Sequence, residues 1–140
     1  MLAALRVRMY LDLTPGLEVP VGYPQMCEAF FAREAGGTTF RSWLAVDGGR
    51  GIGAATLHLF ETFPRIGAPR ALDGRIRSVY VDPAYRRRGI ATRLLEAAIE
   101  EARRESVDRL TLSASVYGRA LYERVGFVAR ANEMIYQPKN

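Results

Sequence analysis

Cysteine is scarce in this sequence, because Cys27 is the only one in 140 residues. A single thiol excludes an intrachain disulfide and a cysteine-based metal cluster, and it is typical of proteins kept in a reducing cytoplasm. Long apolar runs are also missing, since none approaches the roughly 18 residues that a membrane-spanning helix needs. The sequence shows no repeats and no low-complexity stretches. We therefore expect one cytoplasmic globular domain over residues 1–140.

Apolar periodicity and turn residues divide the chain into helices and strands. We predict helices over residues 1–11, 24–35, 89–106 and 117–125, and strands over 39–46, 52–60, 75–81 and 109–114. Residues 63–74 contain two prolines and two glycines and are expected to form a surface loop. Residues 127–129 and 133–136 are expected to form a closing hairpin. This pattern predicts an α/β fold with a central mixed sheet flanked by helices.

A basic turn joins the strand that ends at Val81 to the amphipathic helix that begins near Gly89. Three consecutive arginines, Arg86, Arg87 and Arg88, precede this glycine. Free backbone N–H groups at a helix start attract anions, the helix dipole adds to the attraction, and a glycine lets the ligand come close. Three cations at a helix start oppose the dipole unless an anion is bound. The turn therefore predicts a site for a phosphate-bearing molecule.

The net charge of +5 also permits a basic nucleic-acid-binding domain. That hypothesis is the weaker one, because several arginines alternate with acids, as between Glu100 and Arg104. The phosphate turn already accounts for the densest basic cluster. The sequence also lacks the aromatic pattern that is typical of single-strand binding platforms.

Two motifs, in this order, resemble those of the GNAT superfamily of N-acetyltransferases. The first contains Tyr85-Arg86-Arg87-Arg88-Gly89-Ile90-Ala91 and is similar to the family's acetyl-CoA motif, Arg/Gln-x-x-Gly-x-Gly/Ala. The second contains Leu121-Tyr122 and Gly126-Phe127 and is similar to the family's Leu-Tyr-x-x-x-Gly-Phe segment. The resemblance covers residues 40–136 and implies an acetyltransferase with a GNAT-like three-layer fold that uses acetyl-CoA as co-substrate.

The resemblance places acetyl-CoA in an opening between the strands at 75–81 and 109–114. Backbone groups of Val79 and Val81 are expected to pair with the pantetheine amides, although these residues could also be plain sheet core. Ser115 stands where many family members have an asparagine, and its hydroxyl can still form a hydrogen bond. The expected cofactor-binding residues are Val79, Tyr80, Val81, Arg86, Arg87, Arg88, Gly89, Ile90, Ala91, Thr92, Ser115 and Gly118.

Tyr122 resembles the family's general acid, which protonates the departing thiolate of CoA. Burial would raise the pKa of a tyrosine and keep it protonated. The alternative role is aromatic packing of the short helix on the sheet. With Tyr122 as acid, the chain would move an acetyl group to a primary amine by direct attack. An idle acetyl-CoA-binding module would bind the thioester without turnover.

The group that takes the proton of the amine is less defined, because the strand at 75–81 has no Asp, Glu or His. Glu61, at the end of the preceding strand, is the first candidate for this catalytic base, followed by His58 and Asp73. A small molecule, a peptide N-terminus and a lysine all stay open as acceptors. Three arginines lie in or beside residues 63–74, namely Arg65, Arg70 and Arg75. They agree equally with an acceptor that carries a negative group and with a loop that is merely solvated.

The start of the chain departs from the family pattern. The family usually begins with a strand, whereas residues 1–11 look like the latter part of its first helix. With this first strand missing, the strand at 39–46 would lie at the edge of the sheet and could pair with another chain. We therefore expect a homodimer, and we expect no membrane partner.

Overall fold

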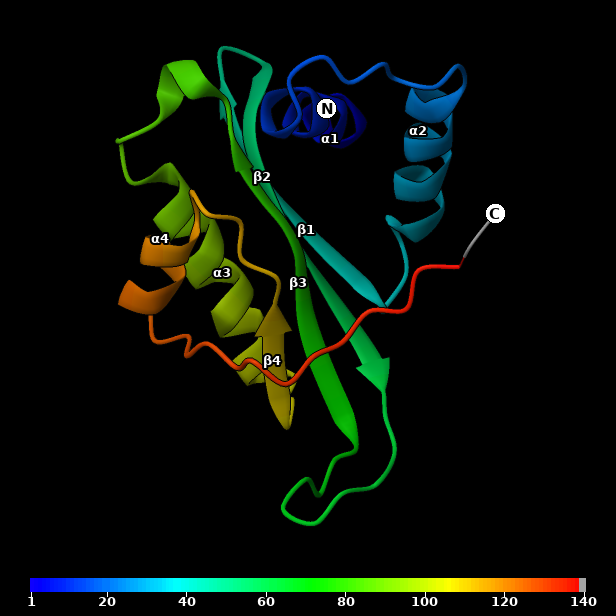
Figure 1. Ribbon diagram of the computed structural model, residues 1–140, viewed down its shortest axis with the longest axis vertical. Helices are drawn as coiled ribbons and strands as arrows, with labels where there is room; N and C mark the ends of the chain where they lie inside the picture. The colour runs from blue at the N-terminus through cyan, green and yellow to red at the C-terminus, as the bar shows by residue number, and fades with distance from the viewer. Residues whose placement is uncertain (139–140) are drawn as a thin grey trace.

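Four strands form one mixed sheet between two layers of helices (Figure 1). The computed structural model describes residues 1–138. The spatial order is β1-β2-β3-β4, in which β1–β2 and β2–β3 are antiparallel and β3–β4 is parallel. The strands are β1 (Phe40–Asp47), β2 (Arg50–Glu61), β3 (Leu72–Val81) and β4 (Arg109–Leu112). The helices are α1 (Leu2–Leu13), α2 (Tyr23–Glu34), α3 (Ile90–Arg104) and α4 (Arg119–Arg124), with a 3-10 turn η1 at Pro83–Tyr85.

Helix α3 covers one face of the sheet with its apolar stripe. Leu95 and Ala98 of this stripe are fully buried, and they pack with Leu57 and Ile76 of the neighbouring strands. Charged residues lie elsewhere on the helix, as expected for a surface helix that buries one side only. The predicted order of helices and strands is confirmed from α1 to α4.

Helix α1 covers the upper part of the opposite face. Its Leu5 is 1% exposed and packs with Ala54 of β2 and Tyr80 of β3. Helix α2 packs beside α1, and its Phe30 meets Phe40 of β1 edge to face at a centroid distance of 5.0 Å. The sheet therefore has an α3/α4 face and an α1/α2 face, and the site depends on both (Figure 1).

The predicted closing hairpin is wrong, because residues 127–138 form neither helix nor strand. The N–H of Phe127 bonds to the carbonyl of Tyr122 at 3.0 Å, which still belongs to the end of α4. Beyond it, the side chains of Val128, Met134, Ile135 and Tyr136 are at least 84% exposed. Strand propensity depends on a packed neighbouring surface, and these side chains lack one in the described chain.

The predicted loop 63–74 is too long at its end, because β3 already begins at Leu72. Asp73 and Gly74 look like turn residues, but they pair with Phe60 and Leu59 of β2. A Cβ on Gly74 would lie 3.1 Å from the Leu110 side chain. Glycine is therefore favoured here by close packing inside the sheet rather than by a turn.

Candidate active site

Strands β3 and β4 separate soon after they pair. Their ladder runs from Asp73–Arg109 only as far as Ile76–Leu112. Immediately afterwards the β2–β3 register shifts between Thr56 and Leu57, which leaves Arg77 as an extra residue on β3. Such a bulge bends and twists its strand. The remainder of β3, from Arg77 to Val81, has no strand partner on its β4 side in the described chain. We call the space beside this unpaired edge the opening, and it is where the resemblance places acetyl-CoA.

Val79 and Val81 present backbone groups to this opening. The N–H of Asp82 bonds to the carbonyl of Ile52 at 2.7 Å, so Asp82 and every second residue before it face β2. The residues between them, Val79 and Val81, face the other edge. In agreement, the Val81 carbonyl accepts a hydrogen bond from Arg86 Nε at 3.0 Å on that side. The side chain of Tyr80 points toward α1, where its hydroxyl donates to Asp12 at 3.2 Å.

The basic turn at the end of β3 has an unusual backbone. Arg87 (φ 61°) and Gly89 (φ 76°) both adopt the left-handed conformation, and no side chain of the described chain caps α3. The first turn of the helix, Ile90 to Thr92, therefore offers free N–H groups, and alternating backbone hand forms an anion-binding nest. Arg87 and Arg88 have no carboxylate within ion-pair distance among residues 1–138. This geometry fits a pyrophosphate.

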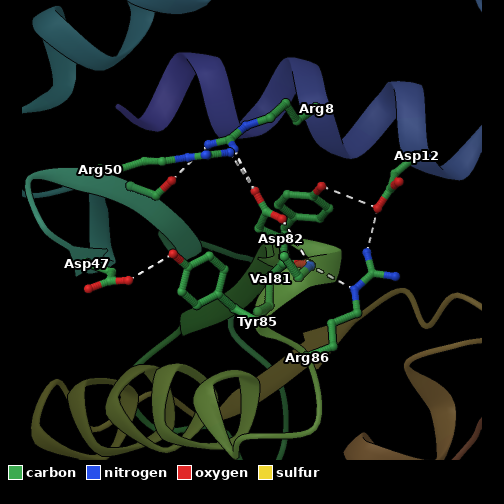
Figure 2. Close-up of polar contacts among 11 residues, drawn as sticks. Arg8, Asp12, Asp47, Arg50, Val81, Asp82, Tyr85 and Arg86 are labelled. Atoms are coloured by element: carbon green, nitrogen blue, oxygen red, sulfur yellow. Dashed lines mark hydrogen bonds and ion pairs between the residues drawn. The ribbon is translucent and has the colours of Figure 1, made fainter.

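Arg86 differs from the other two arginines of the turn, because its guanidinium is already engaged (Figure 2). It binds the Val81 carbonyl and the carboxylate of Asp12 on α1, and it lies over the ring of Tyr80. The side chain thus ties the turn to α1. Its backbone N–H is also engaged, by the carbonyl of Pro83 at 3.3 Å, so the donors left for an anion come from Arg87, Arg88 and the residues after them.

Asp82 anchors the same turn from the other side (Figure 2). Its carboxylate accepts from Arg8 of α1 at 2.8 Å, from Arg50 of β2 at 3.0 Å and from the N–H of Ala84 at 3.1 Å. Arg8 also donates to the carbonyl of Gly51 at 2.8 Å. Helix α1, the β1–β2 hairpin and the phosphate turn therefore meet at one side chain, which is 11% exposed.

We expect Asp82→Ala to lower the free energy of unfolding by about 2–4 kcal/mol, because it leaves two guanidinium groups without their shared partner. Urea unfolding followed by circular dichroism measures this. Asp47→Ala is the matched control, since it removes one exposed hydrogen bond to Tyr85. Equal losses in the two variants would contradict the anchoring role of Asp82.

The second motif explains how Tyr122 is held. Gly126 has φ 108° and ends α4, the N–H of Phe127 bonds to the carbonyl of Tyr122 at 3.0 Å, and that of Gly126 bonds to Glu123. These bonds form a Schellman motif, in which an apolar residue after the glycine contacts the last turn. Here the rings of Phe127 and Tyr122 meet edge to face at 6.2 Å. The spacing between tyrosine and Gly-Phe thus follows from helix termination.

Tyr122 belongs to the apolar cluster that contains Ile76, and Val79 packs against this cluster beside the opening. The tyrosine is 9% exposed. Burial raises the pKa of its phenol above the ordinary value. Within the described residues no hydrogen-bond partner engages its hydroxyl. The phenol therefore keeps its proton and has it available for donation.

Gly118 lies against the ring of Tyr122. A Cβ at this position would lie 2.8 Å from Cε2 and 3.2 Å from the hydroxyl oxygen of Tyr122. The N–H of Gly118 also bonds to Ser115 Oγ at 3.1 Å, so Ser115 closes the turn that leads into α4. Its hydroxyl hydrogen is still free to donate to a ligand.

Gly118→Ala is expected to displace the ring of Tyr122 and to destabilise the protein by about 1–3 kcal/mol through overpacking. The same displacement should lower kcat while acetyl-CoA still binds. Thermal unfolding and steady-state kinetics measure the two effects. Gly36→Ala is the control, because an added Cβ there meets no atom of the described chain within 4 Å. Unchanged kcat in Gly118→Ala would argue against a role for the position of Tyr122.

The three candidate bases lie in different surroundings. Glu61 pairs with Leu72 at the far end of β2, about five residues or roughly 16 Å along β3 from the bulge. The structure does not bring it to the opening, so a role as base would need the amine to bind at that end. Asp73 is held by Arg65 at 2.7 Å. His58 lies nearer, but its Nδ1 accepts from Arg77 at 2.9 Å.

The three arginines that could suggest an anionic acceptor differ in what their guanidinium groups contact. The guanidinium of Arg65 binds Asp73 and Thr62. Arg70 bonds to Asp108 through its backbone N–H only, so its guanidinium is not engaged by that contact. Arg75 lies beside the opening and reaches the hydroxyls of Thr111 and Ser113. Arg77 was not predicted as a site residue, because a bulge within a strand has no local sequence signal here. Two arginines separated by one residue at this strand were the available hint.

Residues 1–138 contain no group of three or more His, Cys, Asp or Glu side chains placed to hold a metal ion. In the same range, every helix is too short or too polar to span a bilayer.

Comparisons with known proteins agree with this geometry. Residues 8–127 match the Acetyltransferase (GNAT) family. A glucosamine 6-phosphate N-acetyltransferase from Trypanosoma brucei brucei is 29% identical over 93% of this chain and 92% of its own length. A predicted acetyltransferase with acetyl-CoA from Clostridium acetobutylicum superposes with a TM-score of 0.86 at 24% identity, covering 97% of this chain and 87% of that one. A GCN5-related N-acetyltransferase from Ralstonia eutropha JMP134 gives 0.81 at 25% identity, covering 97% and 89%. The chain belongs to the GNAT family of acetyltransferases, enzymes that use acetyl-CoA.

Proposed function

We propose that this protein transfers the acetyl group of acetyl-CoA to a primary amine by direct attack, with Tyr122 as the general acid. The observation that carries the proposal is the shared location of three features. The unpaired edge of β3, the uncapped start of α3 and the buried phenol of Tyr122 all border one opening.

The residues divide the work in a defined way. Backbone groups of Val79 and Val81 bind the pantetheine amides and align the thioester along β3. The nest at Arg87–Thr92 and the guanidinium groups of Arg87 and Arg88 hold the pyrophosphate. The amine nitrogen forms the new bond to the acetyl carbon, the C–S bond breaks, and the sulfur takes the proton of Tyr122. The nitrogen releases one proton to water, and the Tyr122 phenolate regains one from water, so that the enzyme returns to its starting state.

Turnover of an amine tests this proposal. The protein is incubated with acetyl-CoA and a panel of amines, and free thiol and acetylated product are both measured. Glucosamine 6-phosphate is the first acceptor to test, because the trypanosomal relative is named for it. Thiol release that depends on the amine and matches the product supports the proposal. Saturable binding of acetyl-CoA without turnover of any amine would indicate an idle binding module instead.

We also propose that the active protein is a homodimer joined through β1. This strand lies at the outer edge of the sheet and pairs only with β2 in the described chain. Its Leu44 and Val46 are 40% and 51% exposed. An antiparallel β1–β1 contact would satisfy the free edge. Light scattering at high protein concentration tests this, and the mass of a single chain would exclude it.

A further inference from the structure

Two arginines and a histidine form a cluster on the α1/α2 face of the sheet, at the bulge of β3. His58 of β2 lies directly opposite Arg75 of β3 in the register. Arg77 donates to His58 Nδ1 from Nε at 3.2 Å and from Nη2 at 2.9 Å. The neighbours Leu57 and Ile76 face α3 instead. The three polar side chains therefore share one surface, which we call the bulge cluster.

The two arginines of the bulge cluster have no counter-ion in the described chain. Glu34 of α2 lies near His58 and opposes the lowering of its pKa, but it pairs with Arg33. Arg65, Arg8 and Arg50 each bind a carboxylate, but neither Arg75 nor Arg77 has one within ion-pair distance among residues 1–138. Burial and the charge of Arg75 both lower the pKa of Arg77. Two guanidinium groups that share one surface and have no paired acid are stabilised by an anion from outside.

The cluster also presents unused donors. Because Nδ1 of His58 accepts from Arg77, the neutral ring carries its hydrogen on Nε2. The ring is fixed by stacking on Phe40, at a centroid distance of 4.3 Å and an angle of 10°. Arg77, which is exposed, and Arg75 each have further N–H groups beyond their present bonds. Donors from three residues match the three terminal oxygens of a phosphate monoester, whereas a carboxylate offers only two oxygens.

The position of the cluster separates it from the pyrophosphate site. Arg77 marks the lower end of the opening, and Val81 leads into the phosphate turn, roughly 13 Å further along β3. Pantetheine lying along β3 would therefore bring its thioester toward the bulge. An anion bound at the cluster would belong to the acceptor, not to CoA.

We propose that Arg75, Arg77 and His58 bind the phosphate of a phosphorylated primary amine and so determine the acceptor class. This inference rests on the proposed acetyl transfer. It names a part of the acceptor that the fold alone does not specify.

Paired amines that differ only in a phosphate test the proposal. Calorimetric titration with phosphoethanolamine and ethanolamine, and with glucosamine 6-phosphate and glucosamine, is performed with saturating CoA so that the phosphate turn is filled. We expect the phosphorylated member to bind at least about 10-fold more tightly. Arg77→Gln should remove this preference. Arg75→Lys keeps the charge but loses the forked N–H donors of the guanidinium, and it should reduce the preference. Arg103→Gln, at the far end of α3, is the matched control and should leave it unchanged.

The outcomes separate this inference from the proposed function. Neutral and phosphorylated amines that bind and react equally would overturn the phosphate site and leave acetyl transfer standing. Phosphate-dependent binding that Arg77→Gln abolishes, without turnover of any amine, would support the site and overturn the proposed function. A preference that survives Arg77→Gln, with unchanged thermal unfolding, would place the phosphate elsewhere.

Discussion

Tyr122→Phe is expected to lower kcat by about 10²- to 10³-fold, the usual contribution of a positioned general acid. The KM for acetyl-CoA should change little, because the phenol oxygen acts on the departing sulfur rather than on the pyrophosphate or the amides. Stability should also stay close to that of the wild type. The lost hydroxyl has no hydrogen-bond partner among residues 1–138, and the ring keeps its contacts with Phe127.

The pH dependence makes the assignment more specific. Burial raises the pKa of Tyr122, so the acid stays protonated through neutral pH, and kcat of the wild type should fall only at a pH above that at which a free tyrosine ionises. Tyr122→Phe should remove this fall at high pH and keep the rise at lower pH that comes from deprotonation of the amine. Steady-state rates from pH 6 to about 11 measure both limbs.

Tyr117→Phe provides the matched control, because it removes the same hydroxyl from a tyrosine that is 87% exposed. We expect its kcat to equal that of the wild type. A large loss in Tyr117→Phe together with a small one in Tyr122→Phe would mean that the acid has been assigned to the wrong tyrosine.

Local sequence was sufficient to predict the short-range backbone geometry on which the proposed site depends. Gly89 and the arginines before it predict an anion-binding helix start, and the backbone conformation of Arg87 and Gly89 agrees with that prediction. The interval from Tyr122 to Gly126-Phe127 predicts the short helix α4, because a Schellman ending fixes that spacing. The stripe on α3 predicts its buried face in the same way.

Features that depend on distant partners could not be predicted from the sequence. Arg86 binds Asp12, which is 74 residues away in the sequence. The motif around Arg86 therefore could not show whether its side chain contacts the ligand or ties the turn to α1. The bulge at Arg77 depends on how β3 pairs with β2. The prediction of a closing hairpin was wrong for a related reason. Alternating apolar and polar residues indicate a strand only where a neighbouring surface packs against it.

The double variant Arg88→Glu/Gly89→Glu is expected to weaken acetyl-CoA binding by about 10²- to 10³-fold, because it replaces a charge-assisted donor and places two carboxylates where the pyrophosphate would lie. An added Cβ at position 89 meets nothing within 4 Å in the described chain, so the new side chain projects into the space left for the ligand. Calorimetric titration with acetyl-CoA measures the loss.

Loss of the fold should not be the cause of that result. A left-handed residue with a Cβ costs about 1–2 kcal/mol at position 89, and acidic side chains at a helix start return about 0.3–1 kcal/mol each. The two effects nearly cancel, so the thermal unfolding midpoint should stay near that of the wild type. Arg103→Glu, at the other end of α3, changes charge by the same sign and should bind acetyl-CoA normally. Normal binding by the double variant would show that the turn does not hold the pyrophosphate. In that case the left-handed Arg87 would need another explanation, because strain of this kind persists where the surrounding structure or a ligand requires it.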